Sequence, residues 1–391
     1  MKSVICEEVA RLCQQVYREG LRAVVLTGSL ARDEATFVKD DEGALLLGDA
    51  EFLLVFGDGE TLPTDADVEL IRQKLEERIA HRGLRADVTL TAVRPDYLRR
   101  LPPSIFAYEL RACGEVISGD ASVLSLIPDF APADIPLEDA WRLLANRLVE
   151  QLESMDELLE ARPTLSPRAH YRTVKLHLDL ATSLLVSVGR YAPTYGERAQ
   201  NLRAGAGPEA PMALWPLPLD QFVADVTSCT AWKLSATGPA LDGERALWER
   251  GIAYAQALWR WELSRLLGSD PGAPASALMT QWMRSQPVAG RLRGWAHVVR
   301  KRGWQSSWRE WSRWLTQASY GSPRHLVYSA AAALLFELSA AANGAGLPPQ
   351  LAQLWARLPM AQANGHAEDS LRSFAASVVS NYKTFVVETR A

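Results

Sequence analysis

The sequence predicts an α+β fold in which a small mixed β-sheet, flanked by helices, is followed by a large all-α region. Apolar runs of strand length, such as Ala23–Leu26 and Phe52–Phe56, lie within the first hundred residues. From Leu137 onward, apolar residues recur at helical spacing instead. Prolines at 128, 132 and 136 separate the two patterns. We therefore expect a sheet domain over residues 1–130.

Two further boundaries divide the helical region. Residues 204–218 are rich in Gly, Pro and Ala, which is typical of a loop. This predicts a helical bundle over residues 137–205 and a helical C-terminal domain over residues 215–391. A chain of 391 residues agrees with two or three domains.

Composition narrows the class of partner. The net charge of −4 lacks the basic footprint of a general nucleic-acid binder, so small molecules are expected instead. The four cysteines are scattered, which indicates neither a zinc site nor a disulfide framework and favours the cytoplasm. The N-terminus turns acidic too early for a signal peptide, and no long apolar run predicts a membrane span.

The first elements of the sheet domain lead to a Gly-Ser turn. A helix over residues 4–19 is followed by the strand Ala23–Leu26, which ends at Thr27-Gly28-Ser29. Glycine allows a phosphate to approach the backbone closely, and amide and hydroxyl groups of such a turn can hold its oxygens. Arg32 follows the turn, and we expect it to pair with Asp33 or Glu34 on a solvated surface rather than to bind phosphate.

Two acids precede the second long strand. Asp49 and Glu51 directly precede the run Phe52–Phe56, and side chains two residues apart on a strand share a face. Neighbouring carboxylates suit Mg²⁺, which is held by one or two carboxylates together with substrate phosphates. The interval between Ser29 and Asp49 is predicted to contain a hairpin formed by residues 37–38 and 44–47.

A third acid stands at the start of another strand. Asp87 begins the run to Val93, after a helix over residues 64–82, and this strand is expected to pair beside the one that carries Asp49 and Glu51. The three acids would then meet at one end of the sheet. The alternative interpretation is that they only solvate strand ends and that the Gly-Ser is an ordinary turn.

This ordered set resembles the DNA polymerase beta-type nucleotidyltransferase superfamily, over about the first quarter to third of the chain. The resemblance implies that Gly28 and Ser29 hold a triphosphate, and that Asp49, Glu51 and Asp87 are the catalytic and metal-binding acids for two Mg²⁺ ions, or for Mn²⁺. Its helical region is similar to those that supply a lysine to the triphosphate. The likeness implies that role for Lys175, with Tyr195 and Arg198 nearby, although Lys175 also fits an ordinary flank of a bundle helix.

The expected activity is transfer of a nucleoside monophosphate from an NTP to a hydroxyl or phosphate of a small-molecule acceptor, with release of pyrophosphate. The acceptor would be a sugar, a sugar phosphate or an aminoglycoside-like compound. Two alternatives stay open: a protein adenylyltransferase of antitoxin type, and a nucleotide-binding protein without catalysis. The sequence identifies neither the base of the NTP nor the oligomeric state.

The segment 291–314 alternates tryptophans with arginines and lysines. Such a mixture can bind single-stranded nucleic acid or an anionic partner. However, Trp304, Trp308 and Trp311 recur at helical spacing, so we expect them in a core with the cations on the solvated face.

Overall fold

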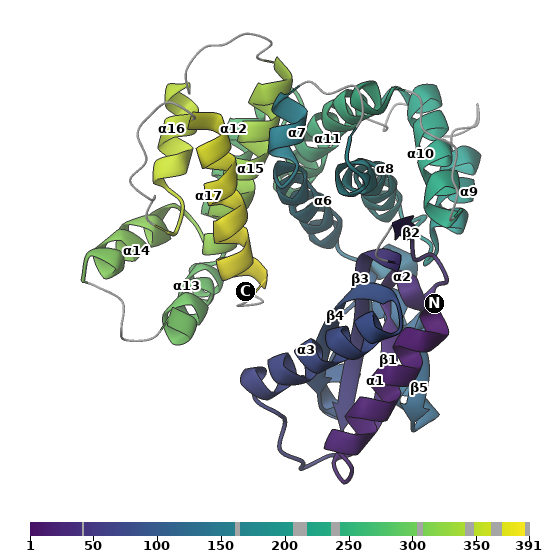
Figure 1. Ribbon diagram of the computed structural model, residues 1–391. Coiled ribbons are helices and arrows are strands. Elements are labelled where there is room, and N and C mark those ends of the chain that lie inside the picture. Colours follow the sequence, from purple (N-terminus) through teal and green to yellow (C-terminus); the bar gives the residue numbers. More distant parts are fainter. Residues whose placement is uncertain are drawn as a thin grey trace. The chain divides into compact units, whose positions relative to one another are not determined.

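The computed structural model describes residues 1–40, 43–160, 165–205, 217–235, 243–302, 308–340, 348–360 and 370–387. The chain divides into two compact units. Unit 1 comprises Met1–Asp139, Leu185–Gly207 and Val226–Leu241; unit 2 comprises Ala140–Leu184, Pro208–Asp225 and Asp242–Ala391. The described residues of unit 1 contain a β-sheet and helices, whereas those of unit 2 are helical (Figure 1). The α+β class is therefore confirmed. Two later segments join unit 1, whereas the sequence predicted three consecutive domains.

Unit 1 is built on a mixed five-stranded sheet. Its strands are β1 (Leu21–Thr27), β2 (Phe37–Asp40), β3 (Gly43–Phe56), β4 (Leu84–Val93) and β5 (Glu115–Gly119). β3 is central: β4 pairs with it in parallel along one edge, while β2 and β1 pair antiparallel with the start and end of the other edge. β5 adds to the outer side of β1, as expected for an edge strand.

The predicted hairpin is present but longer than expected. Phe37 pairs with Leu46 across β2 and β3, and β3 continues without a break to Phe56. The strand starts at Gly43, which has φ +122, and a Cβ at this position would lie 2.5 Å from the Gly83 carbonyl oxygen. A side chain at residue 43 would therefore disturb both the hairpin and the start of β4.

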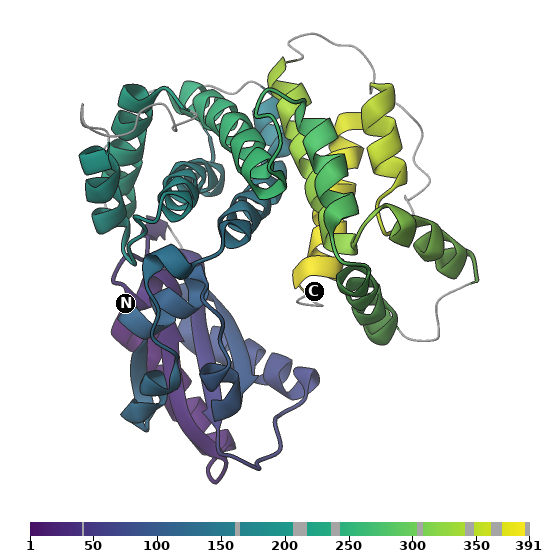
Figure 2. The same ribbon diagram turned by 180° about the vertical axis from the view of Figure 1, so that it is seen from behind.

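Two sets of helices cover the two faces of the sheet. α1 (Lys2–Val16) and α3 (Asp65–His81) pack on one face, together with alternate residues of β3 such as Phe52 and Leu54. α4 (Pro95–Arg99), α5 (Ile105–Cys113) and the 3-10 helix η1 (Ala121–Leu126) cover the other, where Leu53 and Val55 are buried (Figure 2). Alternate side chains of β3 are therefore buried in two separate hydrophobic cores, one on each face of the sheet.

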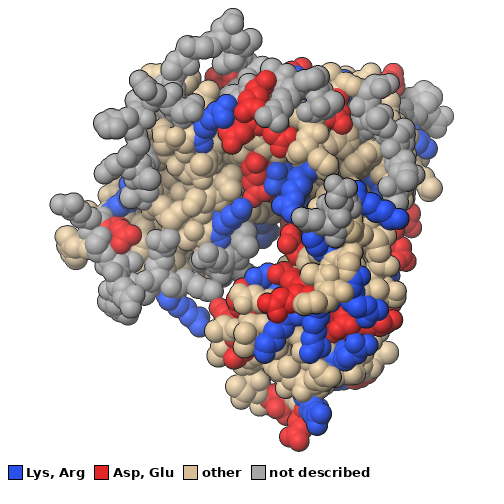
Figure 3. Space-filling view, in the orientation of Figure 1, with Lys and Arg blue, Asp and Glu red and all other residues tan. Residues whose placement is uncertain are grey.

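Among the described residues of α1 and α3, acidic and basic side chains pair with one another on the surface of this face. Glu8 accepts hydrogen bonds from both Arg11 and Arg82, and Arg72 pairs with Glu69 and Glu76. Figure 3 shows acidic and basic side chains interspersed over this part of the surface. Such a mixed surface does not indicate a binding face for a polyanion.

The remaining elements of unit 1 are short. α2 (Gly28–Ala31) follows β1, and the 3-10 helix η2 (Pro132–Asp134) precedes the first boundary. α9 (Tyr195–Gly205) belongs wholly to this unit, and the ends of two longer helices, α8 (Pro167–Ser187) and α10 (Leu219–Leu234), also contribute residues to it.

Unit 2 is assembled from helices around aromatic side chains. Besides most of α8 and part of α10, its helices are α6 (Leu137–Leu152), α7 (Met155–Leu159), α11 (Glu244–Leu267), α12 (Ala275–Ser285), α13 (Val288–Arg302), α14 (Trp308–Tyr320), α15 (Pro323–Ala340), α16 (Pro349–Ala356) and α17 (Ser370–Tyr382), with a π-helical turn at Lys383–Val387. Trp141 is buried, and its ring centroid lies 4.9 Å from that of Trp259 and 5.8 Å from those of Trp282 and Tyr328. Such close, tilted ring pairs stabilise a core beyond their buried area.

The tryptophan-rich segment divides between core and surface. Trp295 and Trp314 are buried, and their indole N–H groups donate to the carbonyls of Gly321 and Pro359. Trp308, however, is 83% exposed. The core prediction is therefore wrong for Trp308, because it opens α14 with its side chain in solvent; Trp304 lies outside the described residues.

A membrane-spanning element was not expected. In the described ranges, every helix is either too short or too polar to cross a bilayer.

Candidate active site

The predicted acids occupy neighbouring positions on adjacent strands. Asp49 of β3 pairs in register with Asp87 of β4, and Glu51 is the next residue of β3 on the same face. The parallel pairing of these strands, which the sequence predicted only as adjacency, brings Asp49 and Asp87 side by side. The backbone thus brings the three acids together, although in the middle of β3 rather than at the predicted end of the sheet, because β3 begins at Gly43 and Ala44 already pairs with Leu84.

These acids lie where the apolar cover of the sheet ends. Further along the same face of β3, Leu53 and Val55 are buried beneath the α4–α5 side, whereas Asp49 and Asp87 are exposed and Glu51 is half-buried. The side chains of Asp49 and Asp87 make no ion pair or hydrogen bond within the described residues. Like charges at adjacent strand positions repel, so the arrangement costs free energy unless a cation is bound.

The Gly-Ser turn lies directly beside Glu51. Thr27, the last residue of β1, pairs with Glu51, and Gly28 follows with φ +70. A Cβ at residue 28 would be 3.1 Å from both Cδ and Oε1 of Glu51. The positive φ favours glycine here, and a larger residue would also make the Glu51 carboxylate move by a few tenths of an ångström. Ser29 is the second residue of the short helix α2, and its carbonyl accepts the amide of Glu34 at 2.9 Å.

The side chains of the three acids are not already arranged as a metal-coordination site. Over the described part of the chain, no group of three or more Asp, Glu, His or Cys side chains is arranged to hold a metal ion. The donor set still suits Mg²⁺, because this ion uses one or two carboxylates and takes its remaining ligands from water and phosphates. Exposed side chains change rotamer in picoseconds to nanoseconds, whereas strand register is fixed. The fit therefore depends on the backbone positions of the three acids.

Lys175 is placed in the other unit. It lies on α8 within unit 2, half-buried, with its ammonium 5.7 Å from the centroid of the Tyr171 ring. The structure therefore does not bring Lys175 together with the acids inside one unit, and its role toward a triphosphate stays a prediction.

A buried ion cluster follows the Gly-Ser turn. Arg32 donates to Glu34 at 2.8 Å and to Glu109 of α5, and only 5% of its side chain is exposed. Burial lowers the pKa of Arg32, but the charge of Glu109, with Tyr195 and Glu34, outweighs it and holds the pKa above its ordinary value. The predicted pairing with Glu34 is confirmed, although the pair is buried rather than solvated.

Tyr195 and Arg198 belong to the same cluster. Arg198 is 3% exposed and donates to Glu109, to the Tyr191 hydroxyl at 2.8 Å and to the carbonyl of Ala192 at 2.7 Å. Its guanidinium also lies 4.9 Å from the centroid of the Tyr195 ring. Burial raises the pKa of Tyr191 well above its usual value, so this hydroxyl stays neutral. Binding of phosphate by Arg198 or Tyr195 would require this cluster to open.

Lys233 of α10 fixes the backbone beyond Arg32. Lys233 is only 1% exposed. Its ammonium donates to the Glu34 carbonyl at 2.6 Å and to the Thr36 hydroxyl at 2.9 Å. Sequence reasoning did not identify Lys233 or Glu109, because their partners lie 199 and 77 residues away along the chain. Only the proximity of Arg32 to Glu34 was visible in the sequence.

Comparison with models of known protein families, with curated proteins and with solved structures found no match to this chain.

Proposed function

We propose that the protein is a metal-dependent nucleotidyltransferase that moves an NMP from an NTP to a hydroxyl or phosphate of a small-molecule acceptor. The observation that supports this most strongly is the register of β3 and β4, which sets Asp49 beside Asp87 and places Glu51 two residues on, next to Gly28. Three exposed or half-exposed acids beside a glycine turn are costly for stability, and they suit a phosphate–metal substrate.

Each residue has a separate part in the proposal. Asp49 and Glu51 would hold two Mg²⁺ or Mn²⁺ ions together with the phosphates of the NTP, and the bound cations supply charge neutralisation at the phosphates. Asp87 would accept or orient the proton of the attacking hydroxyl. The backbone at Gly28 and the hydroxyl of Ser29 would contact phosphate oxygens, since no side chain at residue 28 stands in the way.

Buried ion pairs hold this turn in place. Arg32 forms an ion pair with Glu34, and Lys233 donates hydrogen bonds to the Glu34 carbonyl and the Thr36 hydroxyl, in the segment that begins three residues after α2 ends. A rigid second layer of this kind keeps a catalytic arrangement within a few tenths of an ångström of its working geometry.

The test is release of pyrophosphate from each of four NTPs with Mg²⁺, in the presence of sugar, sugar phosphate and aminoglycoside acceptors. Asp49→Asn and Glu51→Gln are expected to lower turnover at least about a thousandfold, which corresponds to roughly 4 kcal/mol of barrier. Thermal unfolding of Asp49→Asn should occur at the wild-type temperature or slightly above it, because the side chain is exposed and the change removes its repulsion from Asp87. Glu77→Gln, at an exposed position of α3, is the matched control and should keep full activity.

The destination of the label separates the alternatives. With α-labelled ATP, label on the small molecule supports the proposal, whereas label on a protein substrate indicates protein adenylylation. Magnesium-dependent thermal stabilisation by NTP without pyrophosphate release would indicate a binding protein. Wild-type rates of pyrophosphate release from Asp49→Asn would overturn the assignment of the acids.

A further inference from the structure

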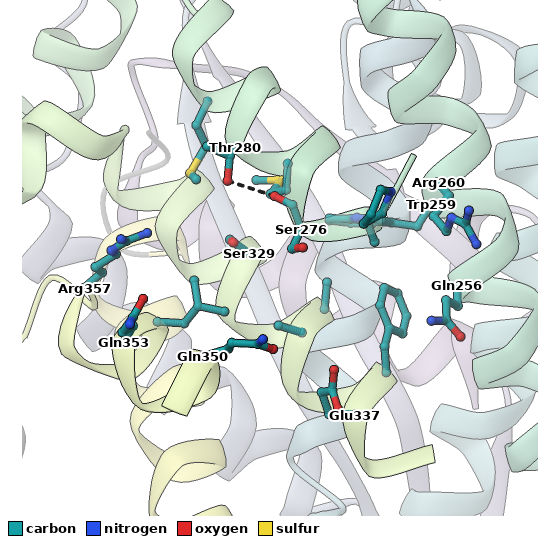
Figure 4. Close-up of a pocket in the computed structure, with 18 of the residues that line it drawn as sticks. Gln256, Trp259, Arg260, Ser276, Thr280, Ser329, Glu337, Gln350, Gln353 and Arg357 are labelled. Carbon is teal, nitrogen blue, oxygen red and sulfur yellow. Dashed lines mark hydrogen bonds between the residues drawn. The ribbon is translucent and has the colours of Figure 1, made fainter. Parts of the chain in front are cut away.

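A pocket of about 550 Å³ lies within unit 2, and Figure 4 shows its lining side chains around an open centre. Residues of α11, α12, α15 and α16 form its walls. Pockets that hold small molecules are typically about 300 to 1,000 Å³ in volume and combine apolar walls with a few polar groups. The size of this pocket is therefore that of a small-molecule site.

The walls of the pocket are aromatic and sulfur-containing. Trp259, Phe336, Met279 and Met283 line it, and each is less than a tenth exposed. Trp259 and Phe336 stand edge to face, with ring centroids 6.4 Å apart. Methionine sulfur makes favourable contacts with aromatic rings and adapts to their shape. These walls favour an aromatic ring in the ligand over an alkyl chain or a polyol.

Three side-chain amides reach the pocket from opposite sides. Gln350 and Gln353 come from α16 and Gln256 comes from α11 (Figure 4). Within the residues that the structure describes, these amides have no hydrogen-bond partner, whereas the Thr280 hydroxyl already donates to the Ser276 carbonyl at 2.8 Å. Each amide offers both donors and an acceptor. They therefore suit a ligand edge that also carries both.

The charged groups at the pocket do not select a charged ligand. Arg260 donates through Nη2 to the carbonyls of Pro271 and Gly272 at 3.3 and 3.1 Å, and its buried Nε–H has no hydrogen-bond partner among the described residues. The Arg357 guanidinium lies 4.5 Å from the centroid of the Tyr320 ring. Glu337, of opposite sign, also lines the pocket. An anion or a cation would meet charges of both signs here.

We propose that this pocket binds an uncharged aromatic heterocycle whose edge carries hydrogen-bond donors and acceptors, as the bases of nucleosides do. The ring would contact Trp259, Phe336 and the methionines, while its edge pairs with the three glutamines. The proposal does not depend on nucleotidyl transfer in unit 1, since every residue that it uses lies in unit 2.

The experiment is saturation-transfer NMR on the full chain with adenosine, guanosine, cytidine and uridine as separate probes, and with benzoate as a charged aromatic comparator. EDTA is present throughout, so that divalent cations cannot support nucleotide binding at the acids of unit 1. We expect saturation transfer to at least one nucleoside and little to benzoate.

Two variants and one control identify the site. Ala333→Trp fills the pocket, and Gln350→Leu with Gln353→Leu removes two amides; each is expected to weaken nucleoside binding at least about tenfold. Ala352→Leu adds an apolar side chain to the exposed side of α16, outside the lining, and should bind as the wild type does. Thermal melts confirm that each variant folds, and if Ala333→Trp does not fold, the glutamine variant decides alone.

Three outcomes would overturn the proposal: no saturation transfer from the wild type to any nucleoside, equal binding by the wild type and the glutamine variant, or a stronger response to benzoate than to every nucleoside.

Discussion

Two groups of charged side chains in unit 1 differ in almost every respect. Asp49, Glu51 and Asp87 carry one sign of charge, stand on one face of the sheet and are exposed or half-exposed. In contrast, the buried ion cluster mixes signs: Arg32 and Arg198 share Glu109. The buried cluster satisfies its charges internally, so it serves structure. The side chains of Asp49 and Asp87 make no ion pair or hydrogen bond within the described residues, so their charge is available to a ligand.

The comparison predicts opposite consequences for removal of a carboxylate. In the cluster, a missing acid leaves buried cations without a partner, which costs much more than the pair itself contributes. At the acids, a missing carboxylate removes repulsion and costs function instead.

Glu109→Gln is expected to be the most destabilising change. It leaves the guanidinium groups of Arg32 and Arg198, whose side chains are 5% and 4% exposed, without their shared carboxylate. Breaking a buried pair in this way costs about 3–5 kcal/mol. Denaturant unfolding of the purified variant measures the loss. Glu69→Gln, at an exposed ion pair on α3, is the control and should unfold like the wild type; an equal, small effect of both changes would contradict the structural role of the cluster.

Lys233→Met is expected to cost less, about 1–3 kcal/mol, which is typical of leaving buried acceptors unsatisfied. The ammonium donates to the Glu34 carbonyl and the Thr36 hydroxyl, and methionine fills similar space without a donor. Hydrogen exchange of the amides in residues 34–37 should increase, while exchange in α3 stays unchanged. Uniform acceleration in both segments would indicate global destabilisation rather than loss of a local clamp.

Glu262 extends the comparison to a buried acid that forms no ion pair within the described part of the chain, although the charge of Arg265 acts on it. It is 0% exposed, Ser183 donates to it at 2.6 Å, and its Oε2 has no partner among the described residues. Burial raises its pKa from 4.5 to about 8, although the Ser183 hydrogen bond opposes this shift. Because the folded form keeps the proton that the unfolded form has lost, the contribution of Glu262 to stability falls as the pH rises from about 4.5 to about 8.

Glu262→Gln, which mimics the protonated acid, removes this dependence. The wild type should therefore lose up to about 1.4 kcal/mol per pH unit relative to the variant between pH 5 and 8. Thermal melts of both proteins at one-unit steps measure the difference. Parallel curves for the two proteins would show that Glu262 is ionised in the folded state.

Local patterns in the sequence predicted most of unit 1. The apolar runs gave the strands, the polar turn at 39–43 gave the hairpin, and Thr64 caps α3 as expected, since its hydroxyl accepts the amide of Asp67. Period two placed Asp49 and Glu51 on one face, and the later strand did pair beside them. These features depend on neighbours within a few residues, which a sequence displays directly.

Features that depend on distant partners were not predicted. Nothing near Lys233 in the sequence indicates that it contacts Thr36, 197 residues away, and an arginine such as Arg198 has the same local pattern whether it binds phosphate or Glu109. The exposure of Trp308 was not predictable for the same reason. Its helical spacing with Trp311 predicts that the two side chains share a face of the helix, but it does not show whether another element covers that face. The segments 185–207 and 226–241 likewise join unit 1 through tertiary packing that periodicity does not encode.

The most direct test of the central claim is binding of Mn²⁺ with ATP, followed by water-proton relaxation, in the wild type, Asp49→Asn, Asp87→Asn and Glu77→Gln. Manganese is a paramagnetic substitute for magnesium at carboxylate and phosphate ligands. The account predicts strong relaxation enhancement for the wild type and Glu77→Gln, and its loss in both aspartate variants. Equal enhancement in all four proteins would show that these acids do not hold a metal–nucleotide complex.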